Sequence, residues 1–320
     1  MKKALITGIA GFAGSHLAQF LLSQKIRVFG FYHPAHATEN LVQIKKNLNL
    51  FACDILKKKD LARHLKKINP DYVFHLAAFS SPPQSFQNPK KTLENNILGQ
   101  LNLLETLALM KSLAKILVVG SADEYGKIDE KLLPANENIP LAPLSPYAVS
   151  KVAQDMLGYQ FYLHQKLNIV RVRPFNHIGP GQSPNFVVSA FASQIVQLEI
   201  RGGGSIKVGN LESYRDFTDV RDMVKAYFVA LEKGTLGEVY NIGSGKPVKI
   251  ALILKLLLSL SSVKITVQKD RRRLRPGDIK IIYCDYSKFK KQTGWQPKIA
   301  LEKTLSDTIE YERSQVNSNS

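Results

Sequence analysis

A glycine-rich segment, Thr7-Gly-Ile-Ala-Gly-Phe-Ala-Gly14, joins a short apolar stretch at residues 3–7 to a longer stretch at residues 12–24. The apolar stretch predicts a buried strand, and the longer one predicts a helix. Gly8, Gly11 and Gly14 allow a tight turn, a close backbone approach to phosphate and close packing of the helix against the strand. Because a helix N-terminus binds phosphate, the segment predicts a site for the pyrophosphate of a dinucleotide.

The segments that follow alternate between strand and helix patterns. Strands are expected at residues 27–32, 50–53, 71–76, 114–119 and 168–173, and helices at 58–67, 92–112 and 147–164. Alternation of this kind requires a parallel sheet with helices on both faces. We therefore predict an α/β fold, a doubly wound Rossmann parallel sheet with a smaller C-terminal α/β lobe that binds the substrate.

The alternation of strand and helix patterns becomes less regular after Pro174, where loops become longer and glycine turns more frequent. Helices are expected at 187–199 and 220–231, and strands at 206–208 and 239–242, the last of which could rejoin the first sheet. The predicted NAD(P)-binding domain therefore comprises residues 1–173 plus about 216–243. The predicted substrate lobe comprises 174–215 plus 244–313, followed by a polar tail at 314–320.

The chain of 320 residues carries a formal net charge of +18, which invites a nucleic-acid interpretation. Most of the basic runs are lysines within expected helices, and no RNA-recognition, helix-turn-helix or zinc-finger signature accompanies them. We therefore predict no nucleic-acid partner. A mild attraction of anionic substrates is the simpler consequence of the charge.

The cysteines and the hydropathy pattern bear on compartment and metal content. Cys53 and Cys284 are far apart in sequence, which fits a reducing compartment and provides no disulfide framework or zinc site. The seven histidines lack metal-ligand spacing, so no metal is expected. The N-terminus does not resemble a signal peptide, and the apolar stretch at 250–260 is too short to span a bilayer. A cytoplasmic protein without membrane contact is expected.

Tyr147 and Lys151 lie four residues apart within an expected helix. This spacing places both side chains on one helix face. A lysine ammonium beside a phenol favours phenolate and lowers the pKa of the tyrosine toward working pH. Such a pair also occurs on ordinary helix surfaces, but its combination with the glycine-rich turn favours an enzyme with a cofactor and a proton donor.

The choice between NAD and NADP stays open at this stage. An acidic residue at the end of the second strand would hold the ribose hydroxyls, and an arginine would accept a 2′-phosphate. The chain has Tyr32-His33-Pro34 there, and the missing carboxylate slightly favours NADP. Asp54 and Ile55 follow the third strand and could reach the adenine, although Asp54 could equally cap a helix.

Several motifs now occur together in one order, and their residues are Thr7-Gly-x-x-Gly-x-x-Gly14, Asp54-Ile55, His75-Leu-Ala-Ala78, Asn96-x-x-Gly99, Ser121, Tyr147-x-x-x-Lys151 and Arg173-Pro-Phe-Asn176. In this order the chain resembles the extended short-chain dehydrogenase/reductases, the nucleotide-sugar epimerases, dehydratases and reductases. The resemblance implies NAD or NADP as cofactor. It also implies a homodimer formed through the helices at 92–112 and 147–164. The implied cofactor-binding residues are Gly8, Gly11, Phe12, Ala13, Gly14, His33, Asp54, Ile55, Leu76, Ala77, Ala78, Asn96, Tyr147, Lys151 and Pro174.

The resemblance also implies catalytic roles. Tyr147 would be the general acid that gives a proton to a C4 carbonyl oxygen. Lys151 would lower the pKa of Tyr147 and hold the nicotinamide ribose, while Ser121 would hydrogen-bond the same C4 oxygen.

The second half of the chain resembles the GDP-sugar branch of the family, in which arginines suit the diphosphate. The implied substrate-binding residues are Ser121, Asp123, Asn176, Phe186, Val187, Arg215, Arg275 and Asp278. Dehydratases of this branch carry threonine at position 121 and an acid/base glutamate two residues later, where this chain has Ser121 and Asp123. We therefore expect reduction of a GDP-linked 6-deoxy-4-keto sugar. The alternatives are a GDP-mannose 4,6-dehydratase, another epimerase or reductase of the family, and a non-catalytic NAD(P)-binding protein.

Overall fold

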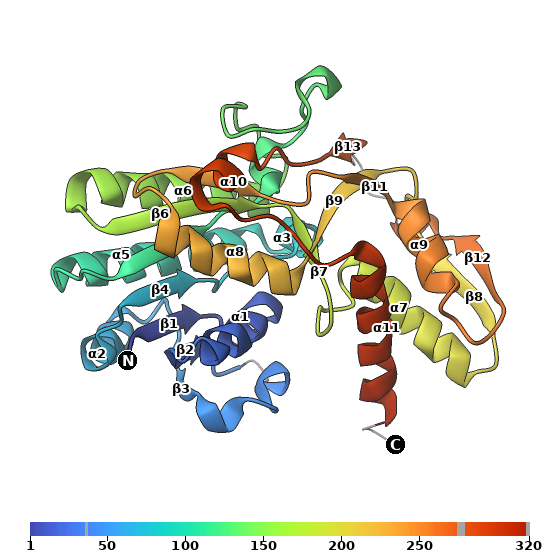
Figure 1. The fold of residues 1–320 in the computed structure, drawn as a ribbon, viewed down its shortest axis with the longest axis horizontal. Coiled ribbons are helices and arrows are strands. Elements are labelled where there is room, and N and C mark those ends of the chain that lie inside the picture. Colours follow the sequence, from blue (N-terminus) through green and yellow to red (C-terminus); the bar gives the residue numbers. More distant parts are fainter. Residues whose placement is uncertain (36–37, 274–278, 318–320) are drawn as a thin grey trace.

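A computed structural model describes residues 1–35, 38–273 and 279–317. Its largest element is a seven-stranded sheet with the order β10-β6-β5-β4-β1-β2-β3, and all neighbours pair in parallel (Figure 1). The predicted doubly wound sheet is therefore confirmed, including the return of the late strand at 239–242. The strands are β1 (Lys3–Thr7), β2 (Arg27–Tyr32), β3 (Asn49–Ala52), β4 (Tyr72–His75), β5 (Lys115–Val119), β6 (Asn168–Pro174) and β10 (Val239–Ile242).

The strand order reverses at β1, which pairs with β2 on one side and with β4 on the other. Ala4, for example, is in register with Val28 of β2 and with Tyr72 of β4. The loops that leave β1 and β4 at their carboxyl ends therefore diverge to opposite faces of the sheet. Such a switch point creates a crevice, and ligands bind there in open α/β sheets.

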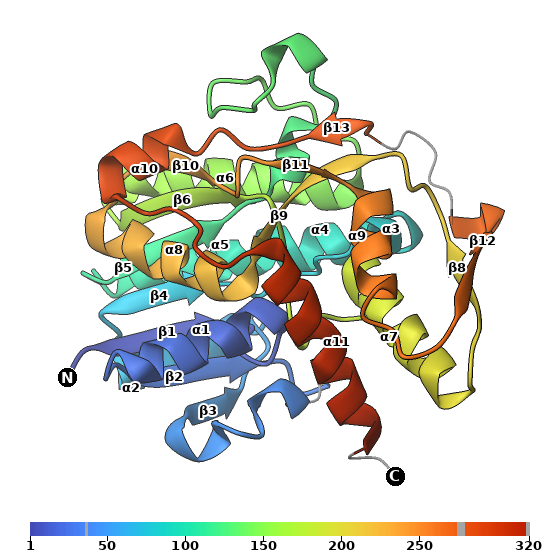
Figure 2. The ribbon, with the colours of Figure 1, turned by 45° about the vertical axis from the view of Figure 1, so that its right-hand side comes forward.

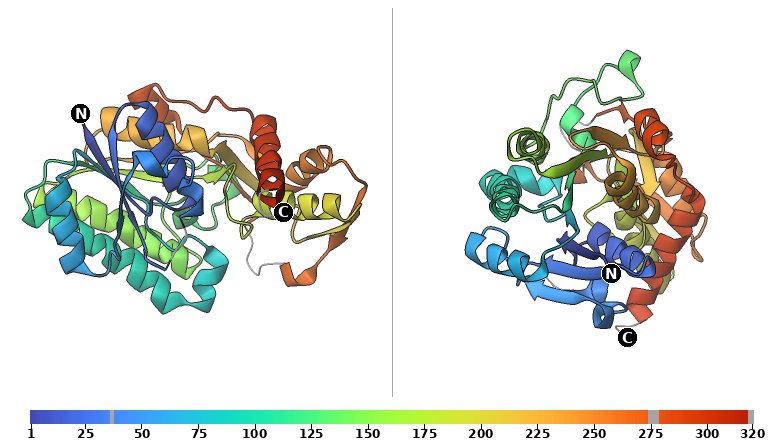
Figure 3. Two further views of the ribbon diagram at one scale, coloured as in Figure 1. Left: turned by 90° about the horizontal axis from the view of Figure 1, so that it is seen from below. Right: turned by 60° about the vertical axis from the view of Figure 1, so that its left-hand side comes forward.

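Helices cover both faces of the sheet, as the end-on view in Figure 3 shows. One core contains Ile6 of β1 with Leu17 and Val224, and the other contains Leu5 with Leu104 and Phe161. Consecutive residues of β1 thus face opposite layers, as the two-residue period of a strand requires. The helices of the first layer include α1 (Phe12–Ser23) and α8 (Val220–Lys233), and those of the second are α2 (Lys58–Ile68), α5 (Gly99–Leu109) and α6 (Pro146–Gln165).

The single helix predicted at 92–112 is wrong in detail. The segment consists of α4 (Pro89–Leu93), a π-helical turn (Glu94–Leu98) and α5, and the chain leaves the helix after Leu109. Asn96 in the π turn is fully buried; it accepts a 2.8 Å hydrogen bond from Phe79 N and donates to Phe79 O at 3.1 Å. Single π turns occur frequently at functional sites. This turn fixes the loop that follows β4.

The C-terminal lobe lies beyond the carboxyl ends of the large sheet (Figure 2). A four-stranded sheet has the order β11-β9-β13 with β7 also on β9, and β8 pairs with β12. The core of the C-terminal lobe includes Phe191, Ile206 and Ile253. The elements are β7 (Asn176–Ile178), β8 (Gly204–Val208), β9 (Tyr214–Asp219), β11 (Pro247–Lys249), β12 (Ile265–Lys269), β13 (Ile281–Ile282), α7 (Val187–Ile200), α9 (Ile250–Leu258) and α11 (Leu301–Asn317).

Two features connect the lobe to the large sheet. Helix α10 (Ser287–Thr293) packs beside β10 and α8, so Phe289 and Trp295 share a core with Ile6 of β1. The buried carboxylate of Asp216 on β9 accepts hydrogen bonds from the main chains of Ser244, Gly245 and Cys284. These contacts join β9 to the loop after β10 and to the segment after β13.

Candidate active site

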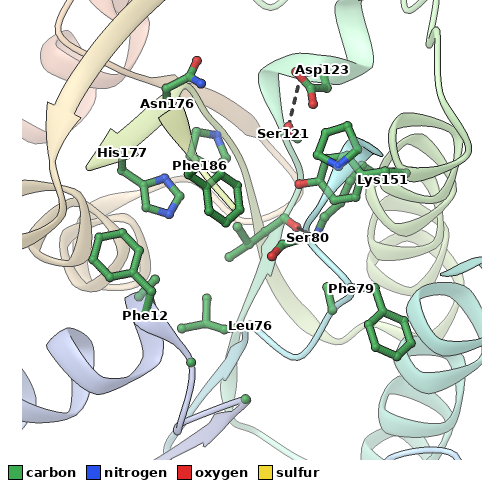
Figure 4. A pocket seen from close by; sticks show the side chains of 18 of the residues that line it. Phe12, Leu76, Phe79, Ser80, Ser121, Asp123, Lys151, Asn176, His177 and Phe186 are labelled. Atoms are coloured by element: carbon green, nitrogen blue, oxygen red, sulfur yellow. Dashed lines mark hydrogen bonds between the residues drawn. The ribbon is translucent and has the colours of Figure 1, made fainter. Parts of the chain in front are cut away.

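A cavity of about 1290 Å³ opens where the carboxyl ends of the large sheet meet the C-terminal lobe (Figure 4). Single-ligand sites are usually about 300–1,000 Å³, so this cavity has room for two ligands side by side. Most of the site residues predicted from the sequence line it. They are Gly8, Gly11, Phe12, Ala13, Gly14, His33, Ile55, Leu76, Ala77, Ala78, Ser121, Asp123, Tyr147, Lys151, Pro174, Asn176, Phe186, Val187 and Arg215.

Two predicted residues have their side chains engaged elsewhere. Asp54 accepts a 2.9 Å hydrogen bond from Leu56 N in a local turn, and Lys57 rather than Asp54 is the N-cap of α2. Asn96 supports the loop at Phe79 rather than lining the cavity. Arg275 and Asp278 lie outside the described residues.

The glycine-rich turn has the geometry that close approach to a ligand requires. Gly8 has a φ of 72°, and a Cβ built there would lie 2.9 Å from Ala77 N. A Cβ on Gly14 would lie 2.3 Å from the carbonyl oxygen of Gly8, so a larger residue would force the helix away from the strand. The turn then leads into α1 at Phe12. These residues fit the pyrophosphate of a dinucleotide cofactor.

The end of β2 forms the part of the cavity where an adenosine ribose would lie. Tyr32, His33 and Ala35 line it, and His33 Nδ1 accepts a 3.2 Å hydrogen bond from Ala35 N. Cys53 and Ile55, which follow the neighbouring strand β3, complete the described lining of this part of the cavity. This lining contains no carboxylate. Among the described residues, the ribose pocket therefore presents no carboxylate that would repel a 2′-phosphate.

Helix α6 brings Tyr147 and Lys151 to the centre of the cavity. Its first turn is fixed by Ser145, whose Oγ accepts a hydrogen bond from Ala148 N at 3.1 Å, and by Pro146 at the first helical position. Lys151 Nζ lies 5.9 Å from the centroid of the Tyr147 ring. Both side chains are buried, so the predicted shared face is confirmed as an inward face.

Ser121 lies just after β5, next to Tyr147 and Lys151 in the cavity lining. Its main-chain N–H donates to Glu124 Oε1 at 2.7 Å, and its Oγ accepts from Asp123 N at 3.1 Å (Figure 4). A side-chain hydrogen bond also links Ser121 to Tyr147. Figure 4 shows Ser121, Asp123 and Lys151 on one side of the cavity and Phe12 and His177 on the other.

The protonation state of Tyr147 differs from the sequence-based expectation. Burial raises the pKa of the Tyr147 phenol, the charges of Asp123 and Glu124 raise it further, and the bond from Ser121 only partly opposes them. Burial also lowers the pKa of Lys151 to about 8. The expected lowering of the tyrosine pKa is therefore wrong for this structure, because desolvation and the two carboxyl groups outweigh the hydrogen bond from Ser121. The phenol is neutral at pH 7 and can donate a proton.

The C-terminal lobe contributes the outer part of the cavity. Asn176 comes from β7, Arg215 from β9, and Phe186 and Val187 from the start of α7. Phe186 and Val187 also line a smaller adjoining hollow of about 130 Å³, together with Lys207 and Arg273.

Sequence reasoning missed the contribution of the segment that runs from Phe79 into the π turn. It contains α3 (Pro82–Gln87), and its residues in the cavity lining are Phe79, Ser80, Pro82, Pro83, Phe86, Lys91 and Asn95. The signal was its position directly after the carboxyl end of β4. His177 was also missed; its ring stacks on Phe12 at 5.8 Å, and burial lowers its pKa to about 4. Its position next to Asn176 was the available signal.

A protein-family model described as GDP-mannose 4,6 dehydratase matches residues 5–308. The chain belongs to this family. Its members are extended short-chain dehydrogenase/reductases, NAD(P)-dependent enzymes that modify nucleotide sugars. Family membership by itself does not distinguish reduction, dehydration and epimerisation.

Three comparisons with known proteins include both a reductase and an epimerase. The chain is 34% identical over 306 residues to the GDP-6-deoxy-D-mannose reductase of Pseudomonas aeruginosa, covering 95% of both chains. The solved structure of RMD from Pseudomonas aeruginosa complexed with NADPH has a TM-score of 0.85 and 31% identity, covering 98% of this chain and 100% of that one. A Thermus thermophilus UDP-glucose 4-epimerase complex with NAD has a TM-score of 0.87 and 28% identity, covering 97% and 99%.

Metal-ligand clusters and membrane-spanning helices are both absent from the described residues. No group of three or more His, Cys, Asp and Glu side chains in this part of the chain could hold a metal ion. None of the helices described is both long and apolar enough to cross a membrane.

Proposed function

We propose that this enzyme reduces the C4 keto group of GDP-4-dehydro-6-deoxy-D-mannose with NAD(P)H and gives GDP-D-rhamnose. The identity of 34% to a GDP-6-deoxy-D-mannose reductase across nearly the whole chain supports this substrate. The observation that carries the reaction type is the neutral phenol of Tyr147, hydrogen-bonded to Ser121 inside the cavity. Reduction of a ketone consumes one hydride and one proton, and a protonated phenol supplies the second.

Bound NAD(P)H would supply the hydride to the C4 carbon. As the C=O double bond becomes a single bond, the C4 oxygen takes the hydroxyl proton of Tyr147. Ser121 Oγ holds that oxygen in place, and the Lys151 ammonium stabilises the phenolate that remains. The main-chain N–H groups of Phe12 and Ala13, in the first turn of α1, would hold the diphosphate of the cofactor, because those of Gly8 and Gly11 donate to Phe31 O and Gly8 O.

We favour NADP over NAD because the described lining at the end of β2 has no carboxylate. A carboxylate there would repel a 2′-phosphate. His33 and the segment around Ala35 would surround that phosphate.

For the GDP-sugar, we assign the diphosphate to Arg215 and Arg275 and the nucleoside to Asn176 and Asp278. Guanidinium groups form paired hydrogen bonds with phosphate oxygens. Phe186 and Val187 would pack on the guanine, and their position between the cavity and the smaller hollow supports this. Asp123 lies close to Ser121 and would face the sugar.

One observation favours a second candidate, a GDP-mannose 4,6-dehydratase. Asp123 lines the cavity, so a carboxylate is available where a dehydratase needs a base for C5. Its side chain is one methylene shorter than the glutamate of typical dehydratases, which disfavours this reaction.

We further propose a homodimer formed through α5 and α6. Exposed apolar residues on α6 recur every seven positions, at Val149, Met156 and Leu163, and Leu109 of α5 is 79% exposed. Residues seven apart share one helix face.

The deciding experiment incubates purified protein with GDP-mannose alone, and separately with GDP-4-dehydro-6-deoxy-D-mannose plus NADPH or NADH. NMR of the products should show a C4 alcohol formed only in the second reaction, faster with NADPH. Formation of the 4-keto sugar from GDP-mannose alone would contradict the reductase assignment.

A further inference from the structure

Glu124 is a fully buried carboxylic acid next to the catalytic group, and the proposed reaction does not use it. It lies in the short 3-10 turn Ala122–Tyr125 that follows Ser121. Its Oε1 accepts the 2.7 Å hydrogen bond from Ser121 N, while Ser121 Oγ accepts from Asp123 N. This reciprocal pair fixes the main chain of Ser121 at the tip of β5.

The space around this carboxylate is shaped to hold it. A Cβ on Gly120 would lie 2.2 Å from Glu124 Oε1, so the carboxylate occupies the volume that a side chain at position 120 would need. The second oxygen, Oε2, lies 3.1 Å from Arg173 Nε, yet the geometry is not that of a hydrogen bond. Arg173 instead binds Asp155 Oδ2 at 2.6 Å and 2.9 Å.

The charges around Glu124 form a buried cluster that spans β6 and α6. Asp155 also binds Arg171 at 2.7 Å, so Asp155 alone balances the two guanidiniums until Glu124 ionises. Lys151 of α6 adds a third positive charge. Its Nζ donates to Val119 O at 2.8 Å and Glu124 Oε1 accepts from Ser121 N at 2.7 Å, so the two groups bind the main chain on either side of Gly120. Without the Glu124 charge, two positive charges in this interior would have no counter-charge.

Glu124 and Lys151 each affect the ionisation of the other. Burial and then Asp155 raise the pKa of Glu124, while Arg173, Ser121 N and Lys151 lower it, and the net result is a pKa of about 8. Burial lowers the pKa of Lys151, and Glu124 opposes that loss. In the described structure, the titratable and charged groups facing Glu124 are Arg173 of β6 and Asp155, Lys151 and Tyr147 of α6, and those facing Lys151 are Glu124, Tyr147 and His75 of β4.

We propose that Glu124 is a positioning residue with two actions: its carboxylate fixes the Ser121 main chain, and its charge keeps the buried Lys151 ammonium protonated as the pH rises. The inference builds on the proposed roles of Ser121, Tyr147 and Lys151. It does not depend on which nucleotide sugar is reduced.

The test follows the titration of Lys151 directly by NMR of protein labelled with ¹³C at lysine Cε, with the Lys151 signal assigned by its loss in Lys151→Met. Glu124→Gln keeps an oxygen that can accept from Ser121 N but removes the charge. The Lys151 midpoint should fall by about one pH unit in this variant, the effect of losing one nearby opposite charge. The alkaline limb of the pH–rate profile should move to lower pH by the same amount. Because the NMR midpoint is read without substrate, an inactive protein would contradict the proposed function and leave this test intact.

Glu137→Gln is the matched control. Glu137 Oε1 also accepts a 2.7 Å hydrogen bond from a main-chain N–H, that of Asn241, and burial also raises its pKa. This variant should leave the Lys151 midpoint unchanged. An unchanged midpoint in Glu124→Gln, or an equal fall in both variants, would overturn the inference.

A reciprocal measurement covers the case in which Glu124→Gln does not fold. Coupling between two sites acts equally in both directions, so Lys151→Met should raise the midpoint of the Glu124 carboxyl ¹³C signal by the same amount. If the Glu124 midpoint stays the same in Lys151→Met, the two groups are not coupled and the inference fails.

Discussion

Lys151 Nζ donates a 2.8 Å hydrogen bond to the carbonyl oxygen of Val119, the last residue of β5. The bond ties the ammonium to the strand whose next residues are Gly120 and Ser121. Helix α6 and the tip of β5 are thereby held at one separation, although they lie 32 residues apart in sequence. Tyr147, the proposed proton donor, and Ser121, which we propose orients the carbonyl, are thus fixed relative to each other.

This arrangement predicts how activity depends on pH. Lys151 is charged below its pKa, which burial lowers to about 8, and it becomes neutral above that value. We expect kcat/KM to be level near pH 7 and to fall about tenfold per pH unit well above pH 8, as one deprotonation requires. A profile measured from pH 6 to 10, with folding checked by circular dichroism at each pH, would contradict this prediction if it stayed level.

Replacing Tyr147 tests the proton donor. Tyr147→Phe keeps the ring and removes the hydroxyl, so we expect the fold to survive and kcat to drop by about 10²–10⁴-fold. Tyr159→Phe is the matched control, since Tyr159 is on the same helix but 41% exposed. Turnover close to wild type in Tyr147→Phe would remove this residue from the mechanism.

Replacing Arg215 tests the substrate side of the cavity. A charge-assisted hydrogen bond contributes roughly 1.5–3 kcal/mol, so Arg215→Ala should raise the KM for the GDP-sugar about tenfold to hundredfold. Arg275→Ala should do the same. Binding of NADPH, measured by fluorescence titration, should not change. The surface variant Arg63→Ala, which breaks only an exposed pair with Asp60, serves as control.

Weakened NADPH binding in Arg215→Ala with an unchanged KM for the GDP-sugar would move Arg215 to the cofactor side.

Much of the site could be predicted because its residues directly follow parallel strands. Gly8 follows β1, Leu76 follows β4 and Ser121 lies just beyond β5, and the carboxyl ends of parallel strands meet at one edge. Local sequence signals locate such positions. The i, i+4 spacing of Tyr147 and Lys151 likewise fixed a shared face before any tertiary contact was known.

The rest depends on contacts between distant segments. Asn96 forms its π turn while bonding Phe79, 17 residues earlier, and Ser150, 54 residues later, and neither partner follows from local pattern. The desolvation that raises the pKa of Tyr147 depends on how deeply α6 is buried. Glu124 could be recognised as part of a charge cluster only after β6 had placed Arg173 beside it.

The apolar residues on α6 predict how copies of the chain associate. Leu163 is 41% exposed and belongs to the row that includes Val149 and Met156. Leu163→Glu would place a charge in the proposed interface, so the dimer should dissociate in size-exclusion chromatography with light scattering. Leu132→Glu, at a residue that is 57% exposed on a different surface, should remain dimeric. A dimeric Leu163→Glu variant would exclude this helix face as the interface.

The segment after Ser121 separates the two leading activities. Reduction needs one hydride and one proton at C4, which the cofactor and Tyr147 supply without Asp123. Dehydration also needs a base that removes the C5 proton, and Asp123 would have to reach it across a longer gap than a glutamate. A base displaced by around an ångström can cost on the order of 10²-fold in rate. We therefore expect wild-type protein to convert GDP-mannose slowly or not at all.

Asp123→Asn should accordingly retain most of the C4 reductase activity, measured as NADPH oxidation with the 4-keto sugar. Asp129→Asn is the matched control, because Asp129 is an aspartate at a short 3-10 turn, as its N-cap, but lies exposed and away from the cavity. Rapid formation of the 4-keto sugar from GDP-mannose in wild type, lost in Asp123→Asn and kept in Asp129→Asn, would replace the reductase assignment with the dehydratase. The reason is that only C5 deprotonation requires a second carboxylate at this position.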